Sequence, residues 1–320
     1  MRFLFFVIII TALPFSLISQ DSTKVTANLK NLDLGIISSS QRSYMTFTQG
    51  IGKNEYKERV SDLEPLVFEG RVSPNYYIRL SKGSNFAFSF TPTITVRMFN
   101  EESNPIFSPS FQPSFTAYHI LGDLNLNESR FSGPFGLYKG TSVYESLSFT
   151  HHSNGQNEPF LNSNGEINFN KGNFSTDFFT YKFHWTNFIQ DSTMNLVATG
   201  FIGYEQHVKF FTREKKLGDN YYFNKLSLYN SFIYEDPKFE FLNKSILQYS
   251  IASYFKGSLK NPRFSFDALY GIKIFEGMDF FLFTRFYIGP DYYNSRYVLN
   301  RRALTFGILT DPFSFSVFNK

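Results

Sequence analysis

The 320-residue chain contains no cysteine and carries little net charge: 31 Lys and Arg residues against 27 Asp and Glu give a formal charge of +4 at pH 7. The lack of cysteine excludes disulfide scaffolds, thiolate nucleophiles and Cys-ligated metal sites. So small a positive charge on this length does not by itself indicate a nucleic-acid-binding surface. After residue 20, no segment reaches the roughly 20 consecutive apolar residues of a transmembrane helix, which excludes a helical membrane protein.

Aromatic residues, in contrast, are abundant. The chain has 42 Phe and 20 Tyr, and aromatic residues make up 20% of it against 18% for charged residues. This composition excludes a disordered exported chain, and it supplies more Phe than a water-soluble core usually needs. Two classes are left, a secreted soluble β protein and an outer-membrane β-barrel.

The N-terminus predicts export. Arg2 precedes an apolar run that ends at Ile18, and small or polar residues follow. A short basic region, an apolar region and a small residue at the exit are typical of a secretory signal peptide, whereas an uncleaved membrane anchor is the alternative. The expected divisions are a signal peptide at 1–19, a periplasmic segment at 20–40 and an outer-membrane barrel at 41–320.

The rest of the chain alternates between apolar and polar residues, with Asn, Gly, Asp and Pro clusters between the segments, which predicts strands. Most segments are as long as the roughly 9–11 residues of a tilted membrane strand. We therefore predict an all-β fold, a 12-stranded antiparallel transmembrane β-barrel. The predicted strands are 85–99, 111–121, 142–153, 173–187, 194–211, 221–234, 238–254, 262–275, 279–288 and 301–310, with weaker ones at 42–49 and 74–80.

The predicted connections also favour a barrel in the outer membrane of a Gram-negative bacterium, because short turns on one side and long loops on the other are its usual arrangement. The stretch 122–141 is too long for a turn and departs from this pattern. The predicted short turns are 188–193, 235–237 and 276–278, and the predicted long loops are 154–172, 212–220, 255–261 and 289–300.

Polar side chains interrupt the lipid-facing side of two neighbouring strands. In 142–153, the more apolar parity includes Leu147 and Phe149 and continues into His151 and Ser153 near the loop. In the next strand, the parity of the aromatic residues extends back to Asp177 and Asn173. Antiparallel pairing would bring these acceptors beside the histidine and serine at the outer boundary of the membrane.

Ionisable groups that face lipid are costly and indicate a function. Serine, histidine and a carboxylate or amide supply a nucleophile, a base and a group that orients the base. His151 would take the proton of Ser153, Asp177 or Asn173 would fix the histidine tautomer, and Gly155 could donate its N–H to an oxyanion. The alternative is that these residues only form a turn at the end of a strand. We expect His119, His184 and His207, which have no such partners in the pattern, to be structural or interfacial.

These residues resemble the outer-membrane phospholipase A family, whose members are 12-stranded barrels with an exterior active site. The family's H-x-S-N-G block is matched by His-His-Ser-Asn-Gly at 151–155, followed by Glu158-Pro159. The segment 104–113 loosely resembles the family's proline-rich loop, and 282–309 resembles its last two strands. Only the H-x-S-N-G block is specific.

The resemblance implies calcium-dependent hydrolysis of phospholipid acyl esters (A1 or A2 type) by a homodimer in the membrane. By motif position, His151 would be the base, Ser153 the nucleophile and Gly155 the oxyanion donor. The carbonyl of Gln156 would be a calcium ligand, and Asn104 falls where the family places a serine that reaches the calcium of the partner subunit.

The sequence departs from the family pattern at three positions. The third catalytic residue of the family is an Asn twelve positions after the serine, where this longer loop has Gly165. Asp177 is the stronger acceptor on the expected face, so we prefer it to Asn173. Gln156 replaces an arginine of the family, and Asn104 replaces its serine.

Two other functions are open. A lipid A deacylase is also an exterior Ser-His barrel enzyme with an H-x-S-N block, but those barrels are about half this length, and an eight-stranded structure would favour it. A non-catalytic barrel, either a pore or an assembly component, could retain the motif as a relic. A His151 side chain that points into the lumen would exclude the enzyme hypothesis.

Overall fold

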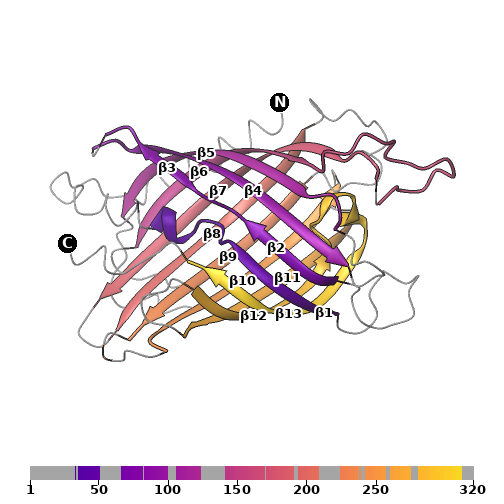
Figure 1. Ribbon diagram of the computed structural model, residues 1–320. Coiled ribbons are helices and arrows are strands. Elements are labelled where there is room, and N and C mark those ends of the chain that lie inside the picture. The colour runs from indigo at the N-terminus through magenta and orange to yellow at the C-terminus, as the bar shows by residue number, and fades with distance from the viewer. Residues whose placement is uncertain are drawn as a thin grey trace.

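The computed structural model describes residues 33, 35–50, 66–81, 83–99, 106–123, 141–169, 171–190, 194–208, 224–236, 238, 242–256, 260–274 and 280–311. Most of them lie in antiparallel strands that wrap into a barrel (Figure 1). The elements are β1 (Tyr44–Gly50), β2 (Leu66–Val72), β3 (Tyr76–Arg79), β4 (Phe86–Phe99), β5 (Ser110–Asp123), β6 (Ser142–Ser153), β7 (Ser175–Gln190), β8 (Asn195–Val208), β9 (Asn224–Glu235), β10 (Lys244–Lys256), β11 (Lys260–Lys273), β12 (Phe280–Pro290), the 3₁₀ turn η2 (Asn294–Val298) and β13 (Asn300–Thr310).

The sheet closes on itself. β1 pairs with β13, and both β2 and β3 pair with β4, so β2 and β3 are two parts of one interrupted barrel strand. The barrel therefore has twelve antiparallel strands, which confirms the predicted fold class. Among the strands that the structure describes, closure leaves no unpaired sheet edge, and this is the condition for a sheet to span lipid.

Most predicted strand ends are shifted by one to six residues, and one missing strand and two connections are the larger departures from prediction. The strand β2 is absent from the predicted strands because Glu69 and Arg71 interrupt its apolar pattern. The predicted tight turn at 235–237 is wrong, since the N–H of Asp236 donates to the carbonyl of Asn243 and closes a wider connection. The predicted long loop at 255–261 is also wrong, because β10 ends at Lys256 and β11 begins at Lys260.

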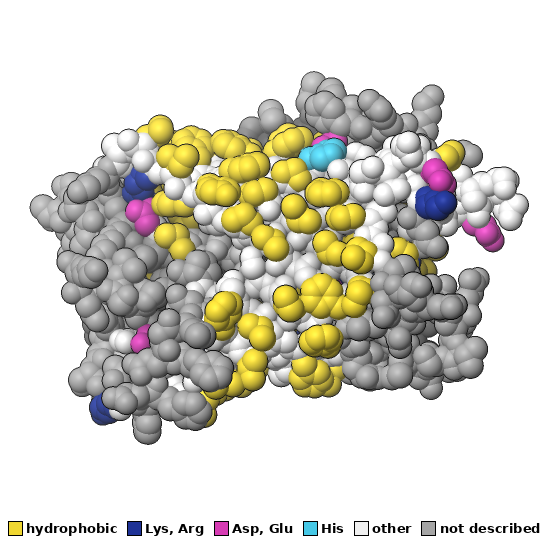
Figure 2. Space-filling view, in the orientation of Figure 1, with side chains coloured by type: hydrophobic (Ala, Val, Ile, Leu, Met, Phe, Trp, Pro, Cys, Tyr) yellow, Lys and Arg dark blue, Asp and Glu magenta, His cyan; other side chains and the backbone are white. Residues whose placement is uncertain are grey.

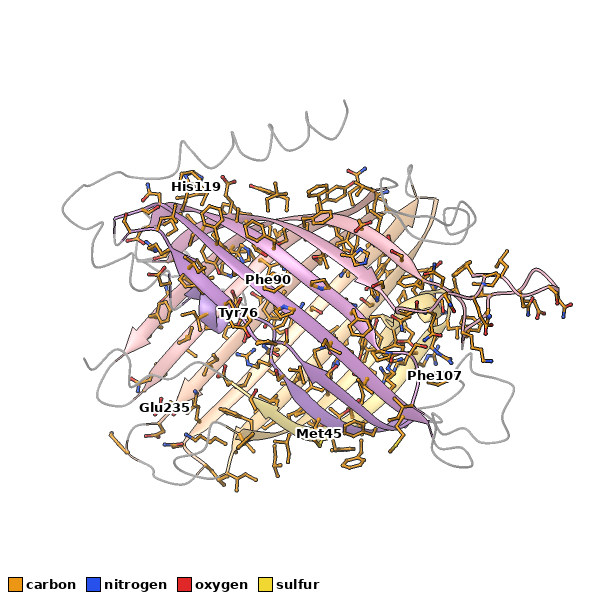
Figure 3. All side chains as sticks on the ribbon, turned by 45° about the horizontal axis from the view of Figure 1, so that its top comes forward. Met45, Tyr76, Phe90, Phe107, His119 and Glu235 are labelled. Atoms are coloured by element: carbon orange, nitrogen blue, oxygen red, sulfur yellow. The ribbon has the colours of Figure 1, made fainter. Side chains whose placement is uncertain are left out.

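Side chains alternate between the lumen and the outer wall. On β6, Ser148 and Thr150 line the lumenal cavity, whereas Leu147 is 47% exposed on the outside. Apolar side chains cover much of the outer face seen in Figure 2. Tyr76 and Phe90 stack on this surface with ring centroids 6.5 Å apart (Figure 3). A polar interior and an apolar exterior indicate a barrel surrounded by lipid.

Buried ion pairs fill the end of the lumen on the side where β6 ends. Arg97 is fully buried, and it donates from Nε to Glu69 Oε2 (2.6 Å) and from Nη1 to Asp291 Oδ2 (2.8 Å). Arg301 donates to the same Glu69 oxygen (3.3 Å), and the Tyr292 hydroxyl donates to the other one (2.8 Å). This network joins β2, β4 and β13 to the segment that follows β12.

The opposite end of the lumen holds the described part of the N-terminal segment. Residues 33 and 35–40 include a helical turn, in which Ile36 is buried against Ile120 and Tyr144. The Ser39 hydroxyl lies 3.2 Å from the Tyr144 hydroxyl. This part of the segment predicted to be periplasmic thus lies against the inner wall, and the predicted signal peptide lies outside the described residues. No helix in the described ranges is long and apolar enough to cross a membrane.

The alternation on β6 gives a labelling prediction. The chain lacks cysteine, so Leu147→Cys and Ser148→Cys each introduce one reactive thiol. We expect a fluorophore at 147 to be quenched by quencher-bearing lipids, because this side chain faces the acyl chains, and a fluorophore at 148 to be unaffected. Quenching at 148 and not at 147 would contradict the orientation of the strand.

The lumenal network gives a stability prediction. Arg97→Ala removes the buried guanidinium that Glu69 and Asp291 share, and breaking a buried ion pair in this way costs about 3–5 kcal/mol. We expect that loss in urea unfolding in lipid vesicles, followed by fluorescence of the single tryptophan. The control is Lys171→Ala, which removes a 3.7 Å ion pair with Glu158 from a 68% exposed side chain and is expected to cost less than about 1 kcal/mol. Equal losses would contradict a stabilising lumenal network.

Candidate active site

The register between β6 and β7 brings two of the predicted site residues together. His151 pairs directly with Asp177, and Ser153 pairs with Ser175. The Nδ1 atom of His151 lies 2.8 Å from Oδ1 of Asp177. The neighbouring residue Thr150 lines the lumen, so His151, of the opposite parity, is on the outer wall.

The two partners differ in burial. The His151 side chain is 40% exposed, whereas that of Asp177 is 2% exposed. A carboxylate can only accept hydrogen bonds, so Nδ1 of His151 is the donor. The Nε2 atom is then left to accept a proton, and this is the tautomer that a general base needs.

Ser153 and Gly155 follow at the end of β6. Ser153 is half-buried, and its hydroxyl has no hydrogen-bond partner among the described residues, so the contact with His151 is not formed in this structure. Ser153 and His151 lie on the same face of β6, with Cα atoms roughly 6.6 Å apart. Hydrogen bonds between catalytic residues often tighten only when substrate binds. Gly155 adopts a φ of 67°, which glycine tolerates far better than other residues.

His152, between the two candidate catalytic residues, faces inward. Its Nε2 atom lies 2.9 Å from the Ser110 hydroxyl and 3.3 Å from Oδ1 of Asn294, and its ring packs edge-on against Phe174 at 4.8 Å. These contacts hold the end of β6 on its lumenal side. They depend on residues far apart in the chain, so no pattern in the sequence indicates them apart from the alternation of the two histidines.

The remaining predicted site residues do not join this pair. Asn173 is half-buried, and its N–H donates to the carbonyl of Glu158 (2.7 Å). The backbone N–H of Gln156 donates to Oδ1 of Asn154 (3.2 Å). Asn104 lies outside the described residues.

The described residues do not fit a calcium site within one chain. Calcium takes six to eight oxygen ligands, usually with carboxylates among them. Across the described ranges, no group of three or more His, Asp and Glu side chains could hold a metal ion. Near the end of β6, Gln156 offers only neutral oxygens.

The expectation that the other histidines lack such partners is wrong for two of them. His119 Nδ1 lies 3.0 Å from Oε1 of Glu145 (His119 is labelled in Figure 3), and His207 Nε2 lies 3.2 Å from Oε1 of Glu205. The first contact crosses from β5 to β6, and it requires a register that the sequence does not reveal. His184 contacts the Ser146 hydroxyl (2.8 Å).

Comparisons with known proteins find similarity in structure alone. The sequence matches no protein-family model and no curated protein. Outer membrane phospholipase A from Escherichia coli superposes with a TM-score of 0.52 at 14% identity, covering 91% of this chain and 98% of that one. The Salmonella typhi outer membrane phospholipase dimer with bound calcium gives 0.52 at 11% identity, with the same coverage. At such identities, the likeness establishes a shared barrel fold.

Proposed function

We propose that the protein is an outer-membrane phospholipase that hydrolyses acyl esters with Ser153, His151 and Asp177. The observation that carries the proposal is the 2.8 Å contact between the exposed His151 and the buried Asp177 on the lipid-facing wall. Ionisable groups facing lipid are expensive, so a pair placed there indicates a function. A nucleophilic side chain two residues away, on the same face, makes it a candidate esterase.

The proposed reaction follows from these roles. Nε2 of His151 accepts the proton of Ser153 as the serine oxygen attacks the ester carbonyl carbon. The N–H of Gly155 donates to the developing oxyanion. Collapse of the intermediate breaks the ester C–O bond, and His151 returns its proton to the departing lysophospholipid oxygen. Water, deprotonated by His151, then hydrolyses the acyl-serine and releases a fatty acid.

The surroundings of the pair favour a lipid substrate. Phe149 and Phe179 are paired across the same two strands, on the same face and next to the His151–Asp177 pair, with ring centroids 5.2 Å apart. Exposed Leu147 follows toward the barrel middle. Acyl chains would lie along this apolar wall, which presents their ester groups to the strand ends. Phospholipids are therefore the proposed substrate class.

The strand count bears on the rival functions. Twelve strands favour a phospholipase over a lipid A deacylase, for which a smaller barrel is expected. A non-catalytic barrel would be compatible with the same geometry, so activity has to separate it from an enzyme. Calcium and homodimer formation belong to the proposal through the family resemblance and the calcium-bound dimer of the Salmonella protein. Since the described residues of one chain do not fit a calcium site, no step above depends on calcium.

Substitution of the triad tests the mechanism. In detergent micelles containing phospholipid, we expect Ser153→Ala and His151→Ala to lower kcat by at least about 10³-fold. Asp177→Asn should lower it by about 10²- to 10⁴-fold, because the amide favours the wrong histidine tautomer. The matched control is Asn173→Ala, which should stay within about twofold of the wild type. Equal hydrolysis by wild type and Ser153→Ala would overturn the proposal.

The calcium and dimer hypotheses have their own test. We expect EDTA to lower hydrolysis by the wild type at least tenfold and added calcium to restore it, with chemical cross-linking of two chains rising in parallel. An activity that is lost in Ser153→Ala but insensitive to EDTA would remove calcium from the proposal and leave the serine mechanism intact.

A further inference from the structure

One buried side chain, Asn154, attaches both ends of the loop between β6 and β7. It is 3% exposed. Its Nδ2 donates to the carbonyl of Gly172 (2.8 Å), and its Oδ1 accepts from the N–H groups of Gln156 (3.2 Å) and Phe174 (3.0 Å). Its own N–H donates to the carbonyl of Phe174 (3.1 Å). Asn154 therefore joins the chain that leaves β6 to the chain that enters β7.

The β7 end of the loop, to which Asn154 bonds, is itself closely packed. Phe174 is fully buried and packs with Phe160 and Tyr297 under the loop. At Gly172, an added Cβ would lie 2.5 Å from the carbonyl oxygen of Asn168, so the backbone there is closely packed. Asn154 thus bonds to atoms that have little freedom to move.

On the β6 side of the loop, the contacts of Asn154 determine the direction of the Gly155 N–H group. The bond from the Gln156 N–H to Oδ1 of Asn154 closes an Asx turn around Gly155, which has a φ of 67°. Among the described residues, the Gly155 N–H has no hydrogen-bond partner. A backbone donor that is free and held in a fixed direction beside Ser153 is the arrangement that oxyanion stabilisation requires.

We propose that Asn154 is a positioning residue that holds the Gly155 N–H toward the oxyanion. This inference rests on the proposed hydrolysis at Ser153. Asn154 acts through Gly155 and does not touch the substrate. Removing a preorganised oxyanion donor lowers kcat by about 10²–10³-fold, so loosening one should have a smaller effect of the same kind.

The experiment compares three variants of the full-length protein in phospholipid-containing micelles. We expect Asn154→Ala to lower kcat by roughly 10- to 100-fold with KM within about threefold, because the loss falls on the transition state. Asn154→Asp keeps the acceptor oxygen, so its kcat should stay within about fivefold of the wild type. The control is Asn162→Ala at the exposed loop tip, where Oδ1 likewise accepts two backbone N–H groups (from Asn164 and Glu166, each 3.0 Å), and kcat should not change.

Hydrogen exchange separates this inference from the proposed function. Asn154→Ala should speed exchange at the Gln156 and Phe174 amides, whether or not the protein is an esterase. Faster exchange with unchanged kcat, or a loss confined to KM, overturns the positioning role. An inactive wild type, or an active Ser153→Ala, overturns the proposed function instead. If Asn154→Ala does not fold into the heat-modifiable barrel form, Asn154→Asp decides: kcat within about fivefold of the wild type supports the role, and a larger loss overturns it.

Discussion

A shift of one residue in the pairing of two strands moves every side chain to the opposite face of the sheet. The register between β6 and β7 is therefore the constraint on which the candidate site depends. It places His151 opposite Asp177 and, two residues earlier, Phe149 opposite Phe179. The inward contact of His184 with Ser146 belongs to the same register. A slip would turn the histidine toward the lumen, where no lipid can reach it.

Elsewhere in the same closed sheet, a charged network inside the lumen joins β2, β4 and β13 to the segment that follows β12. Arg97, Glu69 and Asp291 form a buried charged network inside the barrel, where a soluble protein would have aliphatic side chains. Each charge in this network has a partner, and separating a buried pair costs several kcal/mol of stability. These residues therefore oppose relative movement of the strands that carry them.

Much of the fold could be predicted from the sequence because alternation has a fixed period, and most strands are long enough to show it. The strand β2 could not, since its inward residues, Glu69 and Arg71, are charged and make a membrane strand look like a loop. The same alternation is sufficient to place His151 and Asp177 on one face of the sheet. It could not reveal Asn154 as an anchor, because the anchor depends on Gly172 and Phe174, which return to it only when the loop folds.

An esterase site on the outer wall has a consequence for control. The exposed face of His151 opens toward the surrounding lipid, so a substrate would arrive by lateral diffusion in the membrane. The family resemblance implies that activity is low in an intact membrane, because phospholipid is scarce in its outer leaflet. If the proposed function holds, the rate would then follow the supply of phospholipid to that leaflet, and the site itself could stay preorganised. Asn154, which joins both ends of the loop between β6 and β7, suits that form of control better than a loop without such an attachment would.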